Sequence, residues 1–165
     1  MLKRILVPID GTEHSWRALE YACELVSYTR GSLVVMTVVS GRMKQHIVEF
    51  GSDCLYVQMG DEVLDAAHAI LSGKNIDCTY LLENDNDIAE SILRAVGEQD
   101  CDGIVLGSRG MGVLEGLFRN SVSSVIVENA NVPVTIVSKY AKINEYAGVR
   151  PVRTRFDMLI ICFGR

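Results

Sequence analysis

The sequence has few aromatic residues, no excess of positive charge and no paired cysteine motif, and each absence excludes a class of function. Aromatic residues make up 7% of the 165 residues, which disfavours a surface that stacks nucleic-acid bases. The net charge is −5, so the basic face typical of nucleic-acid binders is missing as well. The five cysteines form no Cys-x-x-Cys pair, which argues against a zinc site. We expect reduced, buried thiols.

Long apolar runs are also absent. No stretch approaches the roughly 18 residues that a membrane-spanning helix requires. The N-terminal "MLKRILVPID" runs directly into a strand-like segment, so we expect no signal peptide. We therefore expect a cytoplasmic protein that binds neither membranes nor nucleic acid and holds no structural metal.

What the sequence does have is a regular alternation of strand-like and helix-like segments within a length typical of one domain. Apolar, β-branched runs predict strands at 3–9, 32–39, 76–82, 102–107 and 132–137. Helical spacing predicts helices after Thr12 and at 60–73, 84–99 and 121–130, whereas 41–58 reads as loop with some helix. This order predicts an α/β fold: an open, doubly wound, five-stranded parallel sheet, Rossmann-like, with helices on both faces.

Such a sheet also predicts where a ligand would bind. Ligands of open α/β sheets lie beyond the carboxyl ends of the strands, where the strand order reverses. The first predicted strand ends in Pro8, Ile9 and Asp10, and the fourth ends in Leu106 and Gly107. These residues are therefore candidates for a site.

The stretch "GSRGMGVLEGLFRNSVSS" (107–124) follows the fourth strand. Glycines let a ligand approach the backbone, and successive backbone N–H groups can form an anion nest. A helix that begins near Ser121 would add its N-terminus and a hydroxyl. The pattern favours a phosphate cradle, although a purely structural turn explains isolated glycines equally well. Arg109, between two of the glycines, suits either a phosphate contact or a solvent-facing loop.

Two phosphate-binding patterns fit this stretch less well. The Walker pattern requires a Gly-Lys-Ser/Thr sequence, but Gly112 is followed by Val113 and Leu114. The dinucleotide fingerprint requires a third small residue where Glu115 stands, and it follows the first strand instead of the fourth.

Two segments together resemble the universal stress protein (UspA) family. "ILVPIDGTEHSWRALEYA" is similar to the family's first strand and helix, and "GSRGMGVLEGLFRNSVSSVIVENANVPVTIV" is similar to its C-terminal signature. The resemblance covers residues 1–138 and leaves 139–165 as a basic C-terminal extension. It implies a non-enzymatic stress-response protein that binds ATP or AMP, with or without Mg²⁺ or Mn²⁺, and signals as a homodimer through antiparallel pairing of strand 132–137.

The resemblance also assigns roles to individual residues. Asp10 and Ile9, after Pro8, would lie beside ribose and adenine; Val38 would contact the adenine edge; Leu106 would line the base or ribose pocket; and Gly107, Gly110, Asn120, Ser121 and Val122 would surround ribose and phosphates. From the residues alone, Asp10 is equally well explained as a turn residue, and Val38 is better explained as core.

The sequence departs from the family's nucleotide-binding pattern at one position. Gly107 and Gly110 match, nine residues follow, and Asn120 then replaces the family's third glycine before the matching Ser121. Asparagine tolerates a left-handed backbone, but its side chain either fills the space of the phosphate oxygens or donates an amide hydrogen bond to them. The alternative function is thus a dimeric interaction module that has lost nucleotide binding.

An enzymatic function has little support. The histidines at 14, 46 and 68 lack metal-ligand spacing and are expected at the surface. No general base or dense carboxylate set for Mg²⁺ accompanies the glycine stretch.

The C-terminal extension differs in charge and pattern from the rest. Residues 139–165 carry a net charge of +4 and the preceding residues −9. Within the extension, "FDMLIICF" (156–163) is apolar and strand-like. It suits an extra edge strand, added to its own sheet or swapped to a partner. A disordered tail is the alternative.

Overall fold

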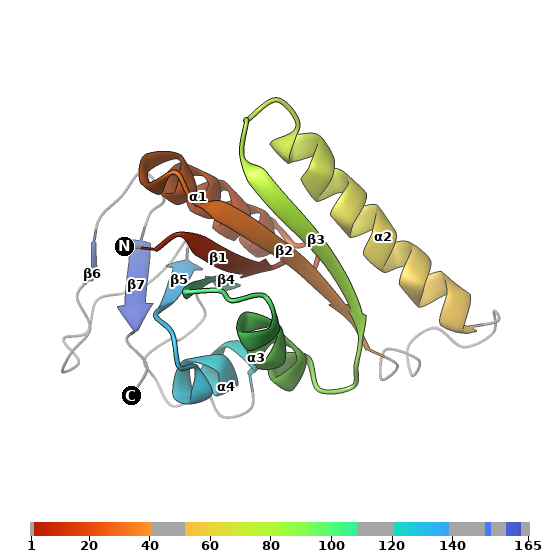
Figure 1. Ribbon diagram of the computed structural model, residues 1–165. Coiled ribbons are helices and arrows are strands. Elements are labelled where there is room, and N and C mark those ends of the chain that lie inside the picture. The colour runs from red at the N-terminus through yellow and green to blue at the C-terminus, as the bar shows by residue number, and fades with distance from the viewer. Residues whose placement is uncertain (1, 41–51, 109–120, 139–150, 153–157, 163–165) are drawn as a thin grey trace.

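The computed structural model of the chain describes residues 2–40, 52–108, 121–138, 151–152 and 158–162, with side chains described at 2–40, 59–108 and 121–138. Strands and helices alternate along the chain (Figure 1). They are β1 (Arg4–Pro8), α1 (Glu13–Thr29), β2 (Ser32–Val39), α2 (Ser52–Leu71), β3 (Asp77–Asn84), α3 (Ile88–Glu98), β4 (Gly103–Ser108), α4 (Val122–Asn129), β5 (Val134–Ser138), β6 (Pro151–Val152) and β7 (Met158–Cys162).

The strands form one sheet in the order β3-β2-β1-β4-β5-β7-β6. Every neighbouring pair from β3 to β5 is parallel, which confirms the predicted five-stranded parallel sheet. Strand β7 then pairs antiparallel with β5, and β6 pairs antiparallel with β7. The described part of the apolar segment 156–163 thus lies in the chain's own sheet.

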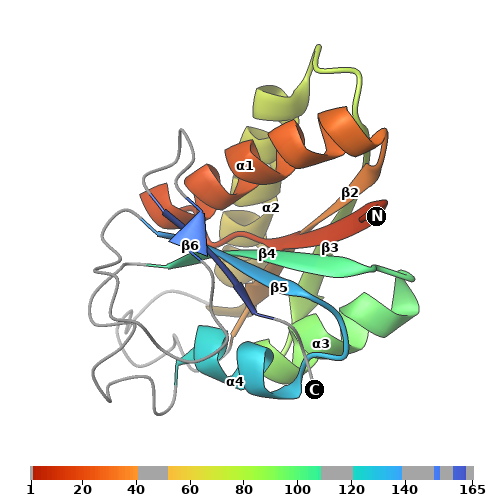
Figure 2. The same cartoon turned by 90° about the vertical axis from the view of Figure 1, so that its left-hand side faces the viewer.

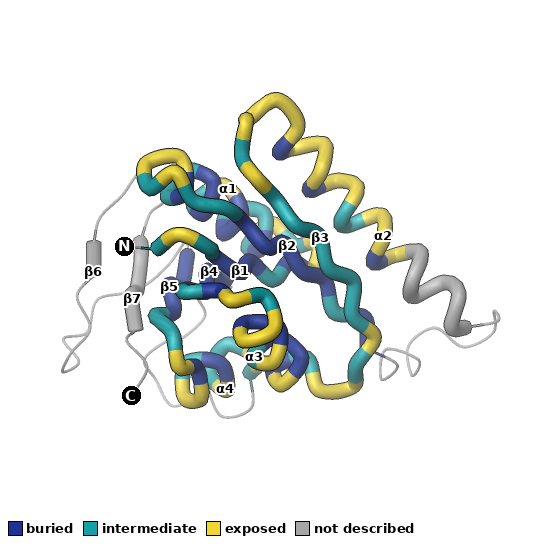
Figure 3. The backbone as a smooth tube through the Cα atoms, viewed as in Figure 1, coloured by how far each residue is buried: buried dark blue, intermediate teal, exposed yellow. Residues whose placement is uncertain are grey.

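Helices cover both faces of the sheet, as Figure 1 shows. Alternate residues of each buried strand point to opposite faces, so Val7 packs with α1 and α2 whereas Leu6 packs with α3 and α4. The central strands β1, β2 and β4 are buried along most of their length (Figure 3). Their near-continuous apolar sequences follow from this double coverage.

Helix α2 begins earlier than predicted, at Ser52 instead of residue 60, and ends at Leu71. The prediction was wrong because glycine is a poor helix former, and Gly60 therefore marked the expected start. Gly60 is buried inside the helix, where a Cβ atom would lie 2.9 Å from the Val39 side chain and closer still to Leu82. The glycine thus lets α2 approach β2 and β3.

Among the described side chains, each face of the sheet holds one buried cysteine. Cys23 belongs to the core under α1 and α2, and Cys101 to the core under α3 and α4. Both are free thiols, and burial raises the pKa of each to about 11. The expected reduced, buried thiols are thus found at these two positions.

None of the helices described here is both long and apolar enough to cross a membrane.

Candidate functional site at the carboxyl edge of the sheet

The strand order reverses between β1 and β4. From β1 the chain adds β2 and β3 on one side, whereas β4 and β5 lie on the other. The carboxyl ends of these strands gather along one edge, where α1 and α4 begin (Figure 2). Because Leu6 of β1 lies opposite Ile104 of β4, the predicted residues at the ends of these two strands come together at this edge.

The short loop from β1 to α1 is closed by its own hydrogen bonds. The Asp10 carboxylate accepts a hydrogen bond from the Thr12 amide at 3.0 Å and another from the Thr12 hydroxyl at 2.6 Å. Thr12 caps α1, since its hydroxyl oxygen accepts the Ser15 amide at 3.4 Å. Asp10 therefore serves the turn that starts α1, as the residue types alone had suggested.

These bonds also set the charge of the loop. Partial burial disfavours ionisation of Asp10, but the hydrogen bonds from the Thr12 hydroxyl and amide outweigh it and hold the pKa of Asp10 below its ordinary value. Asp10 is therefore an anion at neutral pH. Since like charges repel, the Asp10 carboxylate disfavours a phosphate close to it. A ribose hydroxyl, which is neutral, can lie beside it.

Pro8 and Ile9 lie at the carboxyl end of β1, at the same edge of the sheet. Pro8 is half-buried as the last residue of β1, and the Ile9 side chain is 3% exposed within the core under α1 and α2. The Ile9 amide donates to the Met36 carbonyl at 2.8 Å, and the Ile9 carbonyl accepts from the Thr37 hydroxyl at 3.2 Å. Both main-chain groups of Ile9 thus already have partners.

Gly107 lies against the first turn of α1. A Cβ atom at residue 107 would lie 2.8 Å from the Ser15 amide nitrogen and closer still to the His14 carbonyl. These are backbone atoms and cannot move aside cheaply. In the structure, then, the close approach at Gly107 is made by α1. Sequence reasoning had assigned the glycine to a ligand and missed this contact because it joins distant segments.

Val38 and Leu106 lie on the other face of the sheet. Leu106 is 5% exposed, and the half-buried Val38 packs against the same core under α3 and α4. Val38 therefore packs in the core, as its residue type favours. Leu106 precedes Gly107 in β4, whose backbone pairs with β5 through Leu106–Ile136.

Helix α4 begins at the carboxyl edge with a polar first turn. Ser121 caps the helix, and its hydroxyl oxygen accepts the Ser124 amide at 3.1 Å. The Ser121 hydroxyl also lies 3.2 Å from the Ser124 hydroxyl, to which it donates. Val122, the first helical residue, is 37% exposed. The first amides of a helix have no partner inside the helix, so this turn can receive an anion.

Three predicted site residues, Arg109, Gly110 and Asn120, lie outside the described residues. The described remainder of the site is therefore the ends of β1, β2 and β4 and the start of α4.

The structure adds two side chains that sequence reasoning did not assign to the site. Among the described residues, His14 Nδ1 and Arg17 Nη1 are buried without a hydrogen-bond partner. Both belong to the first turns of α1, and the His14 carbonyl contacts Gly107. His14 is half-buried and so departs from the expected surface position. Helical periodicity could not identify it, because this position lies beside the apolar stripe of α1.

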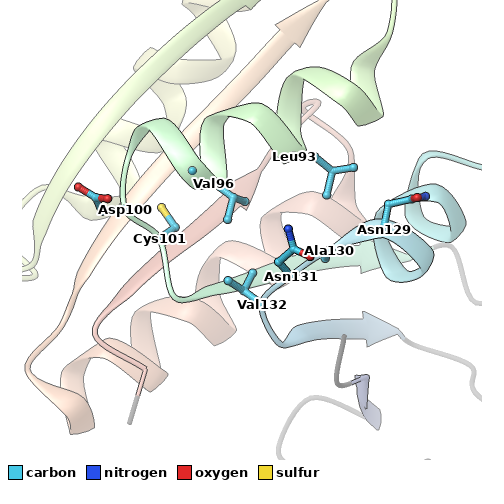
Figure 4. A pocket seen from close by; sticks show the side chains of 9 residues that line it. Leu93, Val96, Asp100, Cys101, Asn129, Ala130, Asn131 and Val132 are labelled. Carbon is cyan, nitrogen blue, oxygen red and sulfur yellow. The ribbon is translucent and has the colours of Figure 1, made fainter. Parts of the chain in front are cut away.

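A cavity of about 400 Å³ lies elsewhere, between the C-terminal ends of α3 and α4. Val96, Cys101 and Val132 line it together with Asn129 and Asn131 (Figure 4). Cys101 precedes β4 and Val132 precedes β5, so the cavity sits at the amino edge of the sheet. Ligands of open parallel sheets bind at the opposite edge.

No group of three or more His, Cys, Asp or Glu residues within the described ranges is placed to hold a metal ion.

The comparisons with known proteins agree with this architecture. The model of the universal stress protein family matches residues 1–138. The chain belongs to the universal stress protein family. A relative from Thermus aquaticus, the universal stress protein in QAH/OAS sulfhydrylase 3'region, is 30% identical over 140 residues that cover 83% of this chain and 99% of the relative.

Two solved structures share the fold. A universal stress protein in complex with cAMP has a TM-score of 0.65 at 18% identity, covering 82% of this chain and 97% of its own. A universal stress protein family protein from Arabidopsis thaliana with AMP bound has a TM-score of 0.62 at 18% identity, covering 82% and 91%. Both are similar to this chain in fold, and their names record adenine nucleotides bound to those proteins.

Proposed function

We propose that this protein is a non-enzymatic adenine-nucleotide sensor of the stress response that binds AMP or ATP at the carboxyl edge between β1 and β4. One observation carries the proposal: the strand order reverses between these two strands, and α4 begins beside them with a capped, polar first turn. The AMP and cAMP held by two proteins of the same fold support the choice of ligand.

The start of α4 is the proposed phosphate-binding element. Ser121 can accept the Ser124 amide and still turn its single proton, because these two interactions use different parts of the hydroxyl. In the proposal the Ser121 O–H turns away from the Ser124 hydroxyl and donates its hydrogen bond to a phosphate oxygen instead. The amides of the first turn and the partial positive charge of the helix N-terminus stabilise the same oxygen.

The proposal divides the remaining roles by charge. The anionic Asp10 faces the ribose, where a carboxylate can accept hydrogen bonds from hydroxyl groups. Val38 and Leu106 border the adenine, and Gly107 with Pro8 and Ile9 fixes the two strand ends. The phosphates lie beside Arg109, Gly110, Asn120 and Val122. Mg²⁺ or Mn²⁺ binds together with ATP, on its phosphates. His14, whose carbonyl lies against Gly107 and whose Nδ1 has no partner, is added to this set.

Calorimetric titration with AMP, ATP and cAMP tests the proposal, after the purified protein has been checked for co-purified nucleotide. We expect micromolar affinity for AMP or ATP. Ser121→Ala should weaken binding about tenfold, the effect of losing one hydrogen bond to a charged group. Ser123→Ala is the matched control, since it removes a hydroxyl from the same turn but leaves the cap in place.

Asn120→Gly separates the two functions that the sequence leaves open. Binding by the unmodified chain supports the nucleotide sensor. Binding that appears only in Asn120→Gly would replace it with a family member that no longer binds nucleotide and acts through protein contacts. No binding by either chain would overturn the assignment of this edge to nucleotide. Steady phosphate release from ATP that Ser121→Ala and Asp10→Ala both abolish would contradict the non-enzymatic part.

The predicted homodimer depends on the outer edge of β5. A second copy would have to pair there through strand 132–137, and β7 lies along that edge in this chain. We therefore propose the nucleotide function without requiring a dimer.

A further inference from the structure

The outer edge of β5 is fully paired by a strand of the same chain. All five residues of β5, from Val134 to Ser138, have a partner in β7. An edge strand normally leaves a row of unpaired N–H and C=O groups, which can recruit a strand from another molecule. In this chain those groups of β5 already have partners.

The direction of β7 is informative. All pairs from β3 to β5 are parallel, and β7 alone meets β5 in the antiparallel sense. A second copy of this chain that met β5 about a two-fold axis would also bring an antiparallel strand, because a two-fold axis perpendicular to a strand reverses its direction. The edge of β5 cannot accept β7 and a second β5 at once.

The new outer edge is interrupted. β6 has two residues, begins with Pro151 and pairs with Leu159 and Ile160 of β7, so the other three residues of β7 have no strand on that side within the described ranges. Proline lacks the N–H that a sheet edge offers to a new strand, and short edge strands give few hydrogen bonds. The continuous five-residue edge of β5 is thus replaced by an edge that a two-residue, proline-containing strand interrupts.

The strand that covers β5 is an addition to the family's domain. The family model ends at residue 138, and the Thermus aquaticus relative is matched over 99% of its own length within 83% of this chain. Residues 139–165 also carry +4 against −9 in the preceding residues. Opposite charges favour the return of the extension to the body that it covers.

We propose that β7 is a built-in edge cap that keeps this protein monomeric by occupying the strand edge through which a second copy of the chain would pair. The proposal concerns self-association alone and does not depend on the nucleotide function. The partner excluded by β7 is a second copy, because the apolar, β-branched sequence of β5, "VTIVS", can pair with itself in the antiparallel sense that β7 uses.

Light scattering over a concentration series tests the cap. The full chain should have the monomer mass of 18.2 kDa. A chain that ends at residue 150 lacks β6 and β7 and should reach about twice its own monomer mass. The relative without a counterpart of the extension indicates that such a chain can fold. Circular dichroism of both chains checks the fold.

A point substitution tests the same cap in the full-length chain. Ile160 lies at the centre of β7, opposite Ile136 of β5. Ile160→Pro removes a strand N–H and should release the cap, which shifts the chain toward the dimer. Ile160→Val keeps the N–H and the β-branched shape and should remain monomeric. This pair answers the question even if the shortened chain does not fold.

A disulfide distinguishes a cap on the same chain from a strand exchanged between two chains. Cys162 lies directly opposite Val134 in the pairing of β7 with β5. After mild oxidation, Val134→Cys should therefore form a disulfide within one chain. The product should run as a monomer on a non-reducing gel and should have lost two free thiols. The unmodified chain, oxidised in parallel, controls for the other cysteines.

The outcomes decide the proposal. A monomeric full chain, a dimeric shortened chain or Ile160→Pro variant, and an intrachain cross-link support it. A dimeric full chain that becomes monomeric on shortening would overturn it and make β7 the dimerisation element. An interchain cross-link, or an unchanged mass in the shortened chain and in Ile160→Pro, would overturn it as well. None of these outcomes depends on whether the protein binds nucleotide.

Discussion

α1 and α4 begin at the same edge of the sheet and use the same kind of cap, yet their cap hydroxyls are held differently. The Thr12 hydroxyl donates to the Asp10 carboxylate at 2.6 Å, whereas the Ser121 hydroxyl donates to the Ser124 hydroxyl at 3.2 Å. A hydrogen bond to a charged acceptor is about twice as strong as a neutral one. The proton of Thr12 is therefore fixed, and the proton of Ser121 is free to be redirected to a ligand.

This difference indicates that one helix start maintains the fold and the other can serve binding. At α1, the Asp10 carboxylate, which we propose to face the ribose, is also the acceptor that orders the loop. At α4, a weak contact between two hydroxyls can be given up without loss of the cap. Four substitutions test this division, and they follow in decreasing order of their expected effect on stability.

The largest effect is expected where the start of α1 meets β4. Gly107→Ala places a Cβ against the backbone of His14 and Ser15 and should lower the free energy of unfolding by about 3 kcal/mol, the upper range of overpacking. Gly97→Ala in α3 is the control. It meets no atom within 4 Å and should raise stability by about 0.5 kcal/mol. Urea unfolding measures both, and equal effects would contradict the contact.

The two caps provide the direct comparison. Thr12→Ala and Ser121→Ala should each lower the free energy of unfolding by about 1 kcal/mol, the usual contribution of an N-cap. Ser121→Ala should weaken AMP binding more than Thr12→Ala, because Ser121 donates to the phosphate in the proposal whereas Thr12 only orders Asp10. Paired urea unfolding and calorimetry distinguish the two effects, and a Thr12→Ala chain that loses AMP affinity as strongly as Ser121→Ala would break the comparison.

The smallest effect is expected from the charge on Asp10. The pKa of Asp10 is lower in the folded chain than its ordinary value, so its ionised form stabilises the fold above about pH 4, and this contribution is lost as the pH falls through the folded-state pKa. Asp10→Asn should lower stability by about 0.5 kcal/mol at pH 7. The difference from the unmodified chain should shrink as the pH falls through the folded-state pKa, and a difference that does not change with pH would show that charge is not its cause.

Local sequence patterns predicted most of the architecture, because helix and strand periods are properties of neighbouring residues. The five parallel strands were predicted with their order along the chain, and Thr12 was identified as the cap of α1. The start of α2 was missed because Gly60 weakens the local helix signal, while its compensation, close packing on Val39 and Leu82, comes from distant strands.

The site followed the same division. The point where the strand order reverses could be predicted, since it follows from the strand alternation. The contacts of its residues could not, because Gly107 meets α1 and Ile9 is tied to Met36 and Thr37 only once the sheet has formed. The unpartnered nitrogen of His14 is likewise a tertiary feature. The roles of Arg109, Gly110 and Asn120 stay predictions.

The two buried cysteines allow the opening of the two helix layers to be measured separately. With a pKa of about 11, Cys23 and Cys101 are about 0.1% thiolate at pH 8, and only the thiolate reacts with an alkylating reagent. Alkylation of Cys23 then depends on how often the α1–α2 layer opens to solvent, whereas Cys101 lines the cavity between α3 and α4 and needs a smaller opening. The masses of the two cysteine peptides after timed exposure to iodoacetamide would report separately how often the α1–α2 and α3–α4 layers lift from the sheet.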